Sequence, residues 1–299
     1  MLTHLRLKAY AKINLALDVL GRRPDGYHEV RMIMQTVGLH DRIDLYRREK
    51  PGISIGTNLF YLPNNEQNLA YRAAALLMEE FHIKEGISIR LRKFIPVAAG
   101  MAGGSSDAAA VLFGVNRMFG LGLSVKELME RGVKLGADIP YCLMRGTALS
   151  EGIGEELTRL SPAPQCQVLV AKPGISVSTK MVYEELDALS LSPADHPDID
   201  GMLEALKAGS LQGVADKMGN VLELVTARHY PVIGQIEEVM KKHGAAGAMM
   251  SGSGPTVFGL FDDPAAAKAA YESLRRGPDA GLAKQVYLTD LFHTVRRRG

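Results

Sequence analysis

A run of small residues between positions 96 and 106 offers this chain a place to hold an anion. Glycines at 100, 103 and 104 let the backbone bend around a bulky group, and an alanine-rich helical pattern follows. Ser105, Ser106 and Asp107 are good N-cap residues, so we expect them to begin that helix. A helix start presents unpaired N–H groups and a partial positive charge, which suits a phosphate. The simpler alternative is a tight loop leading into a core helix.

Asp138 and Lys12 are the charged side chains best suited to chemistry beside such a loop. Asp138 stands between Gly136 and Pro140, where we expect a short loop. A carboxylate held there could take the proton of an acceptor hydroxyl during phosphoryl transfer, although capping a turn is the other interpretation. Lys12 lies in an apolar strand pattern, where it would either extend to solvent or keep a nearby carboxylate ionised. The sequence alone does not show that the two side chains meet.

The loop differs from the two best-known nucleotide-binding motifs. No Gly-Lys-Ser/Thr closes it, so it is not a P-loop. We expect the preceding strand, 86–92, to belong to an antiparallel set, and no ribose-binding acid follows, which argues against a dinucleotide fold. Lys93, just upstream, could bring a cation near the phosphates. Together these features favour nucleotide binding over a plain loop.

Composition limits the other classes of protein. The chain has 299 residues, 46% of them hydrophobic, and a formal net charge of +2, so bulk nucleic-acid binding is not expected. The basic run at 296–298 is expected to be a solvated tail. Cys142 and Cys166 lack metal-site spacing and are expected to be inert core residues. Charges run through the N-terminal apolar stretch, so we expect no signal peptide, no membrane span and a cytoplasmic protein.

Apolar periodicity predicts a mixture of strands and helices. Strands are expected at 5–20, 27–37, 41–46, 86–92, 141–144, 147–150, 167–171, 248–250, 256–261 and 284–289. Helices are expected at 68–82, from the glycine-rich loop to about 119, and at 124–135, 178–189, 201–208, 210–226, 231–243 and 264–276. Ser124 and Glu127 form a capping box. A Pro-rich break at 161–164 predicts two domains, 1–161 and 162–299, the second with a β-α-β-β-α-β pattern.

Three segments, in order along the chain, resemble the signature motifs of the GHMP kinases. They are residues 11–15 (Ala-Lys-Ile-Asn-Leu), residues 96–106, and residues 251–255 (Ser-Gly-Ser-Gly-Pro). Four further segments are most similar to the branch of that family that serves the non-mevalonate isoprenoid pathway: 23–28, 136–140, 151–155 and 173–179. The resemblance extends from about residue 7 to 290, nearly the whole chain.

The resemblance implies a fold and an activity. The fold would be α+β with two domains, the first like domain 2 of ribosomal protein S5 and the second ferredoxin-like. The reaction would transfer the γ-phosphoryl group of ATP, accompanied by Mg²⁺, to the 2-hydroxyl of a cytidine-diphosphate-linked methylerythritol. The partners would be these small molecules, with no nucleic acid and no membrane.

The resemblance also implies roles for individual residues. Asp138 would be the catalytic base and Lys12 its partner. The ATP-binding residues would be Asn68, Lys93, Pro96, Val97, Ala98, Ala99, Gly100, Met101, Ala102, Gly103, Gly104, Ser105 and Ser106, with Ser106 the one candidate Mg²⁺ ligand. The substrate-binding residues would be Asn14, Tyr27, His28, Thr179 and Tyr183, with Tyr27 stacked on the cytosine and His28 at its edge.

Departures from the family pattern and alternative functions complete the prediction. Ala102 replaces a glycine and should have a negative φ, and Asp107 should point away from the phosphates. Another GHMP enzyme, such as a mevalonate-pathway kinase or decarboxylase or a homoserine kinase, is disfavoured by the Tyr27-His28 pair. A regulatory protein that binds nucleotide without catalysis is disfavoured by the presence of both Lys12 and Asp138.

Overall fold

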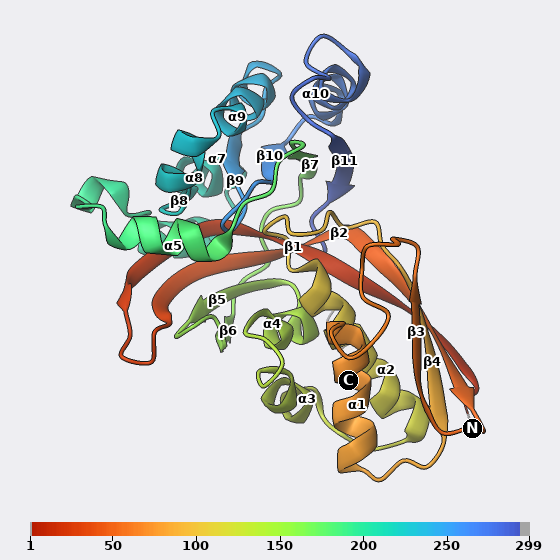
Figure 1. Cartoon of the computed structure of the whole chain (residues 1–299). Helices are drawn as coiled ribbons and strands as arrows, with labels where there is room; N and C mark the ends of the chain where they lie inside the picture. The colour runs from red at the N-terminus through yellow and green to blue at the C-terminus, as the bar shows by residue number, and fades with distance from the viewer. Residues whose placement is uncertain (1, 294–299) are drawn as a thin grey trace. The chain divides into compact units, whose positions relative to one another are not determined.

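The chain is organised in two compact units that interleave along the sequence. The computed structural model describes residues 2–293. Among these, the first unit holds 2–11, 39–97 and 102–144, and the second holds 12–38, 98–101 and 145–293. The two long N-terminal strands, β1 (His4–Arg22) and β2 (His28–Arg48), contribute residues to both units (Figure 1).

Two sequence predictions stay untested. The domain boundary near 161–164 remains a prediction, and the basic run at 296–298 lies outside the described residues. No helix among residues 2–293 is long and apolar enough to cross a membrane.

The first unit places helices against paired strands. β4 (Gly86–Arg92) pairs antiparallel with residues 42–48 of β2, and β3 (Gly52–Thr57) pairs parallel with β4. The helices of this unit are α1 (Leu69–Glu80), α2 (Gly103–Phe119), α3 (Val125–Gly132) and α4 (Asp138–Met144). Helix α2 lies beside α1 and also contacts α4 (Figure 1).

Close packing of α2 on the strands depends on Gly114. A Cβ added to this residue would come within 2.3 Å of Leu45 Cδ1 and 2.7 Å of Leu7 Cδ1, so a side chain here would force the helix outward. Because residue 114 is glycine, α2 packs closely on the strands of the first unit. The glycine-rich loop leads into the N-terminal end of this helix.

The second unit is built on an antiparallel sheet with the order β11-β7-β10-β9. Its strands are β7 (Gln167–Lys172), β9 (Gly247–Met250), β10 (Val257–Phe261) and β11 (Gln285–Asp290). Read across the sheet, these are the fourth, first, third and second of its strands in chain order, which is the ferredoxin-like arrangement. This agrees with the predicted α+β fold.

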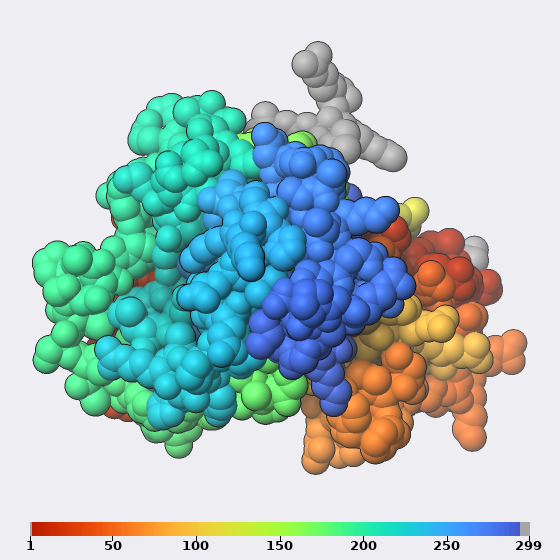
Figure 2. Space-filling model, turned by 90° about the horizontal axis from the view of Figure 1, so that it is seen from above, coloured from red at the N-terminus to blue at the C-terminus, as the bar shows by residue number. Residues whose placement is uncertain are grey.

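Helices and short strands complete the second unit. They are β5 (Thr147–Glu151), β6 (Glu156–Arg159), α5 (Thr179–Asp187), η1 (Pro193–Asp195), α6 (Ile199–Ala208), α7 (Leu211–Asp216), β8 (Gly219–Asn220), α8 (Glu223–His229), α9 (Val232–Lys242) and α10 (Pro264–Arg276). Figure 2 shows α9 in light blue beside α10 in deep blue on the near face of this unit. β5 pairs with residues 32–35 of β2, and β8 pairs with β1.

Four predicted elements are wrong. The strands expected at 27–37 and 41–46 are one strand, β2, because the strand continues through residues 38–40, where Gly38 interrupts the apolar pattern without ending it. The run 141–144 belongs to helix α4, since a short apolar run does not distinguish a strand from a buried helix. The helix expected at 210–226 is divided into α7, β8 and α8 by tertiary pairing at Gly219 and Asn220.

Candidate active site

The start of α2 is open to an anion. The helix begins at Gly103, and its N-cap, Ala102, makes no side-chain cap hydrogen bond. No side chain therefore competes for the first N–H groups of this 17-residue helix, which leaves them able to bind a negatively charged ligand.

Two predictions about this loop are wrong. Ser105, Ser106 and Asp107 lie inside α2 rather than at its N-cap, because the left-handed backbone of Ala102 begins the helix earlier. Ala102 has φ +53°, not the negative value expected. Such a conformation costs a residue with a Cβ about 1–2 kcal/mol, so the surrounding structure must hold it there.

Ser106 is engaged inside the first unit. Its Oγ donates a hydrogen bond of 2.6 Å to the backbone oxygen of Tyr10, and the residue is buried. The bond ties the first turn of α2 to β1. The role of Ser106 toward Mg²⁺ stays a prediction, and residues 2–293 contain no cluster of three or more His, Cys, Asp or Glu side chains able to hold a metal ion.

In the second unit, the tip of the glycine-rich loop packs on the loop at 251–254. Ser251 Oγ donates to the Gly100 backbone oxygen at 3.0 Å. A Cβ on Gly100 would lie 2.0 Å from the Ser251 oxygen, and Gly100 has φ +70°. A Cβ on Gly252 would lie 3.2 Å from Gly100 Cα. Only glycine permits this approach of two backbones.

Lys12 and Asn14 lie next to these loops on β1. The Lys12 Nζ donates to Asn14 Oδ1 at 2.5 Å, and Lys12 is only 5% exposed, so it does not extend to solvent. The Asn14 backbone N–H donates to Ser251 Oγ at 3.3 Å, and the Lys12 N–H donates to the Met101 oxygen at 3.2 Å. The structure thus joins the first and third signature motifs through Asn14, which also accepts a hydrogen bond from the Lys12 ammonium.

Asp138 is the first residue of α4 in the first unit, not a loop residue. Ile139 anchors this end of the helix: a Cβ on Gly132 would lie 2.7 Å from its Cγ2, so α3 and α4 pack closely. Asp138 is half-buried, and no hydrogen bond or ion pair within residues 2–293 engages its carboxylate. Lys12 belongs to the other unit, so the pairing of Lys12 with Asp138 stays a prediction.

The predicted substrate residues of the second unit form two groups. His28 stacks at a tilt on Tyr183, with ring centroids 4.7 Å apart, and its Nε2 lies 2.8 Å from Asp187 Oδ1. Tyr27 is 60% exposed, so its ring is accessible for stacking on a ligand. Thr179, at the start of α5, shares a hydrogen bond of 2.8 Å with Ser253 Oγ.

Two predicted ATP-binding residues already have partners in the first unit. Asn68 caps α1: its Oδ1 accepts the Ala70 N–H at 3.0 Å, and its Nδ2 donates to the Pro63 oxygen at 2.9 Å. The Lys93 ammonium is buried and bonded to the carboxylates of Asp41 and Asp107. Their roles toward ATP stay predictions.

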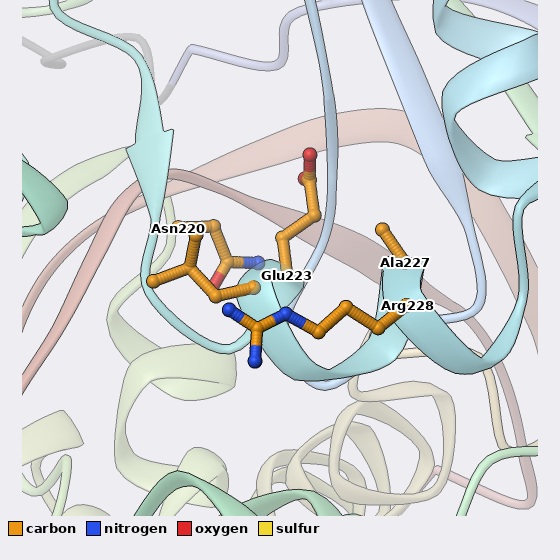
Figure 3. A pocket seen from close by; sticks show the side chains of 5 residues that line it. Asn220, Glu223, Ala227 and Arg228 are labelled. Atoms are coloured by element: carbon orange, nitrogen blue, oxygen red, sulfur yellow. The ribbon is translucent and has the colours of Figure 1, made fainter. Parts of the chain in front are cut away.

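Sequence reasoning missed Asn220, which supports the loop at 251–254. Its Nδ2 donates to the backbone oxygens of Met250 and Gly252 at 3.0 and 2.8 Å. No local pattern marks this residue, since its role depends on distant backbone. A pocket of about 420 Å³ beside it is lined by Asn220, Glu223, Leu224, Ala227 and Arg228 (Figure 3). There the Glu223 carboxylate points away from the Arg228 guanidinium and accepts the Met250 N–H at 2.8 Å.

The two cysteines are buried free thiols, as the sequence predicts. Burial, followed by the charges of Asp262 and Asp290, raises the pKa of the Cys166 thiol to about 12, which makes it a poor nucleophile.

Comparison with known protein families agrees with this geometry. The family model described as the GHMP kinases N terminal domain matches residues 68–146, and the model of the GHMP kinases C terminal matches residues 202–279. The chain belongs to the GHMP kinases.

Curated relatives within that family share one name. The chain is 57% identical to "4-diphosphocytidyl-2-C-methyl-D-erythritol kinase" of Lachnospira eligens over 96% of its own length and 98% of the relative's. It is 55% identical to the protein of the same name in Lachnoclostridium phytofermentans over 96% and 97% of the two chains.

Solved structures agree on the fold. A crystal structure of 4-(cytidine 5'-diphospho)-2C-methyl-D-erythritol kinase, 33% identical, matches 97% of this chain and 100% of its own with a TM-score of 0.81. Homoserine kinase from Cytophaga hutchinsonii, 21% identical, matches 97% and 96% with a TM-score of 0.79, a likeness of fold alone.

Proposed function

We propose that this protein is an ATP-dependent kinase that phosphorylates the 2-hydroxyl of 4-(cytidine 5'-diphospho)-2-C-methyl-D-erythritol in the non-mevalonate isoprenoid pathway. The observation that carries the proposal is the identity of 57% over 96% of the chain to a relative with that kinase name. The residues of the site agree with the proposal. The first unit holds the start of α2, which suits phosphates, and the Asp138 carboxylate, and the second unit holds the buried Lys12.

In the proposed reaction, Asp138 accepts the proton of the substrate hydroxyl as its oxygen attacks the γ-phosphorus. The bond from that phosphorus to the bridging oxygen breaks, and ADP leaves with the electron pair. The N–H groups at the start of α2 would bind the ATP phosphates, and Lys12 would stabilise the developing charge. Mg²⁺ would arrive with ATP and neutralise phosphate charge, in keeping with the lack of a carboxylate metal cluster within residues 2–293.

The proposed selection of the cytidine group rests on the second unit. Tyr27 would stack on the base, His28 would bond its edge, and Thr179, Tyr183 and Asn14 would contact the substrate. Asp187 fixes the orientation of the His28 ring through the 2.8 Å contact. A cytoplasmic location and small-molecule partners alone, without nucleic acid or membrane, are part of the same proposal.

ATP consumption with the cytidine substrate tests the reaction. We expect the wild type to consume ATP with this substrate and not with mevalonate or homoserine. Asp138→Asn should lower kcat about 10²-fold or more, because the general base is lost while the shape is kept. Asp44→Asn, which removes a carboxylate paired with exposed Arg6, is the control for the loss of a carboxylate away from the reacting hydroxyl. Unchanged turnover in Asp138→Asn would refute its role as base, and turnover of homoserine instead would refute the substrate.

Substitution of His28 tests the selection of the base. His28→Ala should raise KM for the cytidine substrate roughly tenfold and leave KM for ATP unchanged, since one hydrogen bond to the base edge is lost. His229→Ala is the matched control, because His229 also pairs with a carboxylate, Glu185, at 2.6 Å, but on the surface of α8. An equal rise in both KM values would show that His28 does not select the cytidine base.

A further inference from the structure

A fully buried ion cluster lies beneath the glycine-rich loop in the first unit. Its members, Lys93, Asp41 and Asp107, have side chains that are 4%, 0% and 4% exposed. The Lys93 ammonium donates to Asp107 Oδ2 at 2.6 Å and to Asp41 Oδ2. We call these three residues the Lys93 cluster. Burying three ionisable groups costs free energy that a surface pair does not, so their position needs a reason.

The cluster joins the two ends of the loop. Lys93 immediately precedes the loop and Asp107 follows it inside α2, so the bond between them closes the chain around residues 94–106. Asp41, on β2, accepts the backbone N–H groups of Phe94 and Ile95 on Oδ1 at 2.5 and 2.8 Å. A single carboxylate thus binds the ammonium and the two residues, Phe94 and Ile95, that connect Lys93 to the loop.

Further contacts fix Lys93 itself. Its backbone N–H donates to Asn58 Oδ1 at 2.7 Å, and its backbone oxygen accepts from Asn58 Nδ2 at 3.2 Å. A Cβ added to Gly103 would lie 3.3 Å from the Lys93 Nζ, so the first residue of α2 rests on the ammonium. Ile95 Cγ2 lies closer still, at 3.1 Å, so Lys93 and Ile95 together support the start of the helix.

We propose that Asp41 and Asp107 are positioning residues of the glycine-rich loop: with Lys93 they clamp its two ends, so that the N–H groups at the start of α2 are held in place for the phosphates of ATP. In this arrangement the Lys93 ammonium is a structural cation and not a phosphate ligand. The inference rests on the proposed function in that the ligand of the loop is ATP.

The charge balance of the cluster supports this assignment. Burial raises the pKa of Asp107 well above its usual range; Lys93 opposes that rise and Asp41 adds to it. Asp107 Oδ1 has no hydrogen-bond partner within residues 2–293, which a buried carboxylate anion would require. A protonated Asp107 would donate a hydrogen bond or remain neutral without requiring a second partner, which fits its unpartnered Oδ1.

A rise in pH through the raised pKa of Asp107 should weaken the clamp and the binding of ATP. The charged groups that act on Asp107 are Lys93 after β4 and Asp41 on β2. Loss of the Asp107 proton leaves one uncompensated negative charge beneath the phosphate-binding N–H groups. Asp107→Asn keeps a neutral group of the same shape and should not show this effect.

Direct binding of ATP to the whole protein, measured by calorimetry without the second substrate, tests the proposal. Asp107→Ala should raise Kd for ATP about tenfold or more, because the loop loses its fixed position. Asp107→Asn should restore binding at neutral pH and remove the rise in Kd with pH that the wild type shows. Asp44→Asn, which removes a carboxylate of β2 paired with exposed Arg6, is the control and should leave Kd unchanged.

The outcomes separate the two proposals. If the wild type binds no ATP, the proposed function fails. If the wild type binds ATP and folded Asp107→Ala binds it equally well, the clamp is refuted. Where Asp107→Ala does not fold, the comparison across pH decides: the same rise of Kd in Asp107→Asn and in the wild type would refute the clamp, and a rise in the wild type alone would support it.

Discussion

Two buried acid clusters, one in each unit, resolve the cost of burial in different ways. In the Lys93 cluster, an internal cation lies between two carboxyl groups. The second cluster consists of Glu223, Glu237 and Lys241, which we call the Glu237 cluster. There the cation, Lys241, is 55% exposed and lies 3.5 Å from Glu237 Oε2.

The position of the cation changes the charge state of the acids. Burial lowers the pKa of Lys93, but the charges of Asp107 and Asp41 outweigh it, so the net pKa is raised and the ammonium stays charged. In the Glu237 cluster, burial and then the charge of Glu223 raise the pKa of Glu237 to about 8, and Lys241 opposes this only in part. In both clusters a buried acid has a raised pKa, but only in the Lys93 cluster is the cation itself buried and kept charged by the neighbouring acids.

The largest effect expected from this contrast is that of removing each cation. Lys93→Met should lower the free energy of unfolding by roughly 3–5 kcal/mol, because it leaves a buried carboxylate unpaired. Lys241→Met should cost less than about 1 kcal/mol, because its partner can remain protonated and the lysine is exposed. Urea unfolding at neutral pH measures both. An equal loss of unfolding free energy in the two variants would show that burial of the cation makes no difference to its contribution.

The second effect is a difference in pH dependence. In the unfolded chain Glu237 loses its proton near its ordinary pKa of 4.5, but the folded protein retains it until about pH 8. The folded state binds more protons between these values, so stability falls as pH rises through them. Glu237→Gln should remove this fall and stabilise the protein above pH 8 by on the order of 5 kcal/mol.

Unfolding measured across that pH range, with the exposed neighbour Glu238→Gln as control, tests the expectation. The same slope in Glu237→Gln and in the wild type would mean that Glu237 is already ionised in the folded protein.

The smallest expected effect concerns Lys241, the exposed cation of the Glu237 cluster. Lys241 lowers the pKa of Glu237, so Lys241→Met should move the titration of Glu237 to higher pH. As an i,i+4 pair it should contribute only about 0.3–0.5 kcal/mol. Carboxyl chemical shifts measured against pH would detect the movement, and Lys242→Met should cause none. A movement to lower pH would contradict the assigned sign.

Sequence reasoning succeeded where the signal is local. The capping box of Ser124 and Glu127 and the helix at 264–276 both follow from neighbouring residues and are confirmed. The α+β fold and the family also followed from motifs whose order along the chain is specific.

Sequence reasoning failed where distant residues decide. Lys93 precedes the glycine-rich loop, and nothing near it indicates that Asp41, on another strand, buries and neutralises it. Ala102 has a positive φ that alanine disfavours, so only the surrounding fold explains it. Asn220 likewise acts on backbone groups of Met250 and Gly252 that follow much later in the chain.

The pairing of β8 with β1 has a consequence for the order in which the protein folds. Ala16 and Leu17 lie opposite Gly219 and Asn220, and Asn14 bonds to Ser251, so the strand that carries Lys12 finds these partners only in the last third of the chain. Contacts of such long sequence separation form slowly. During synthesis, β1 must therefore wait for these much later segments before its part of the site can assemble.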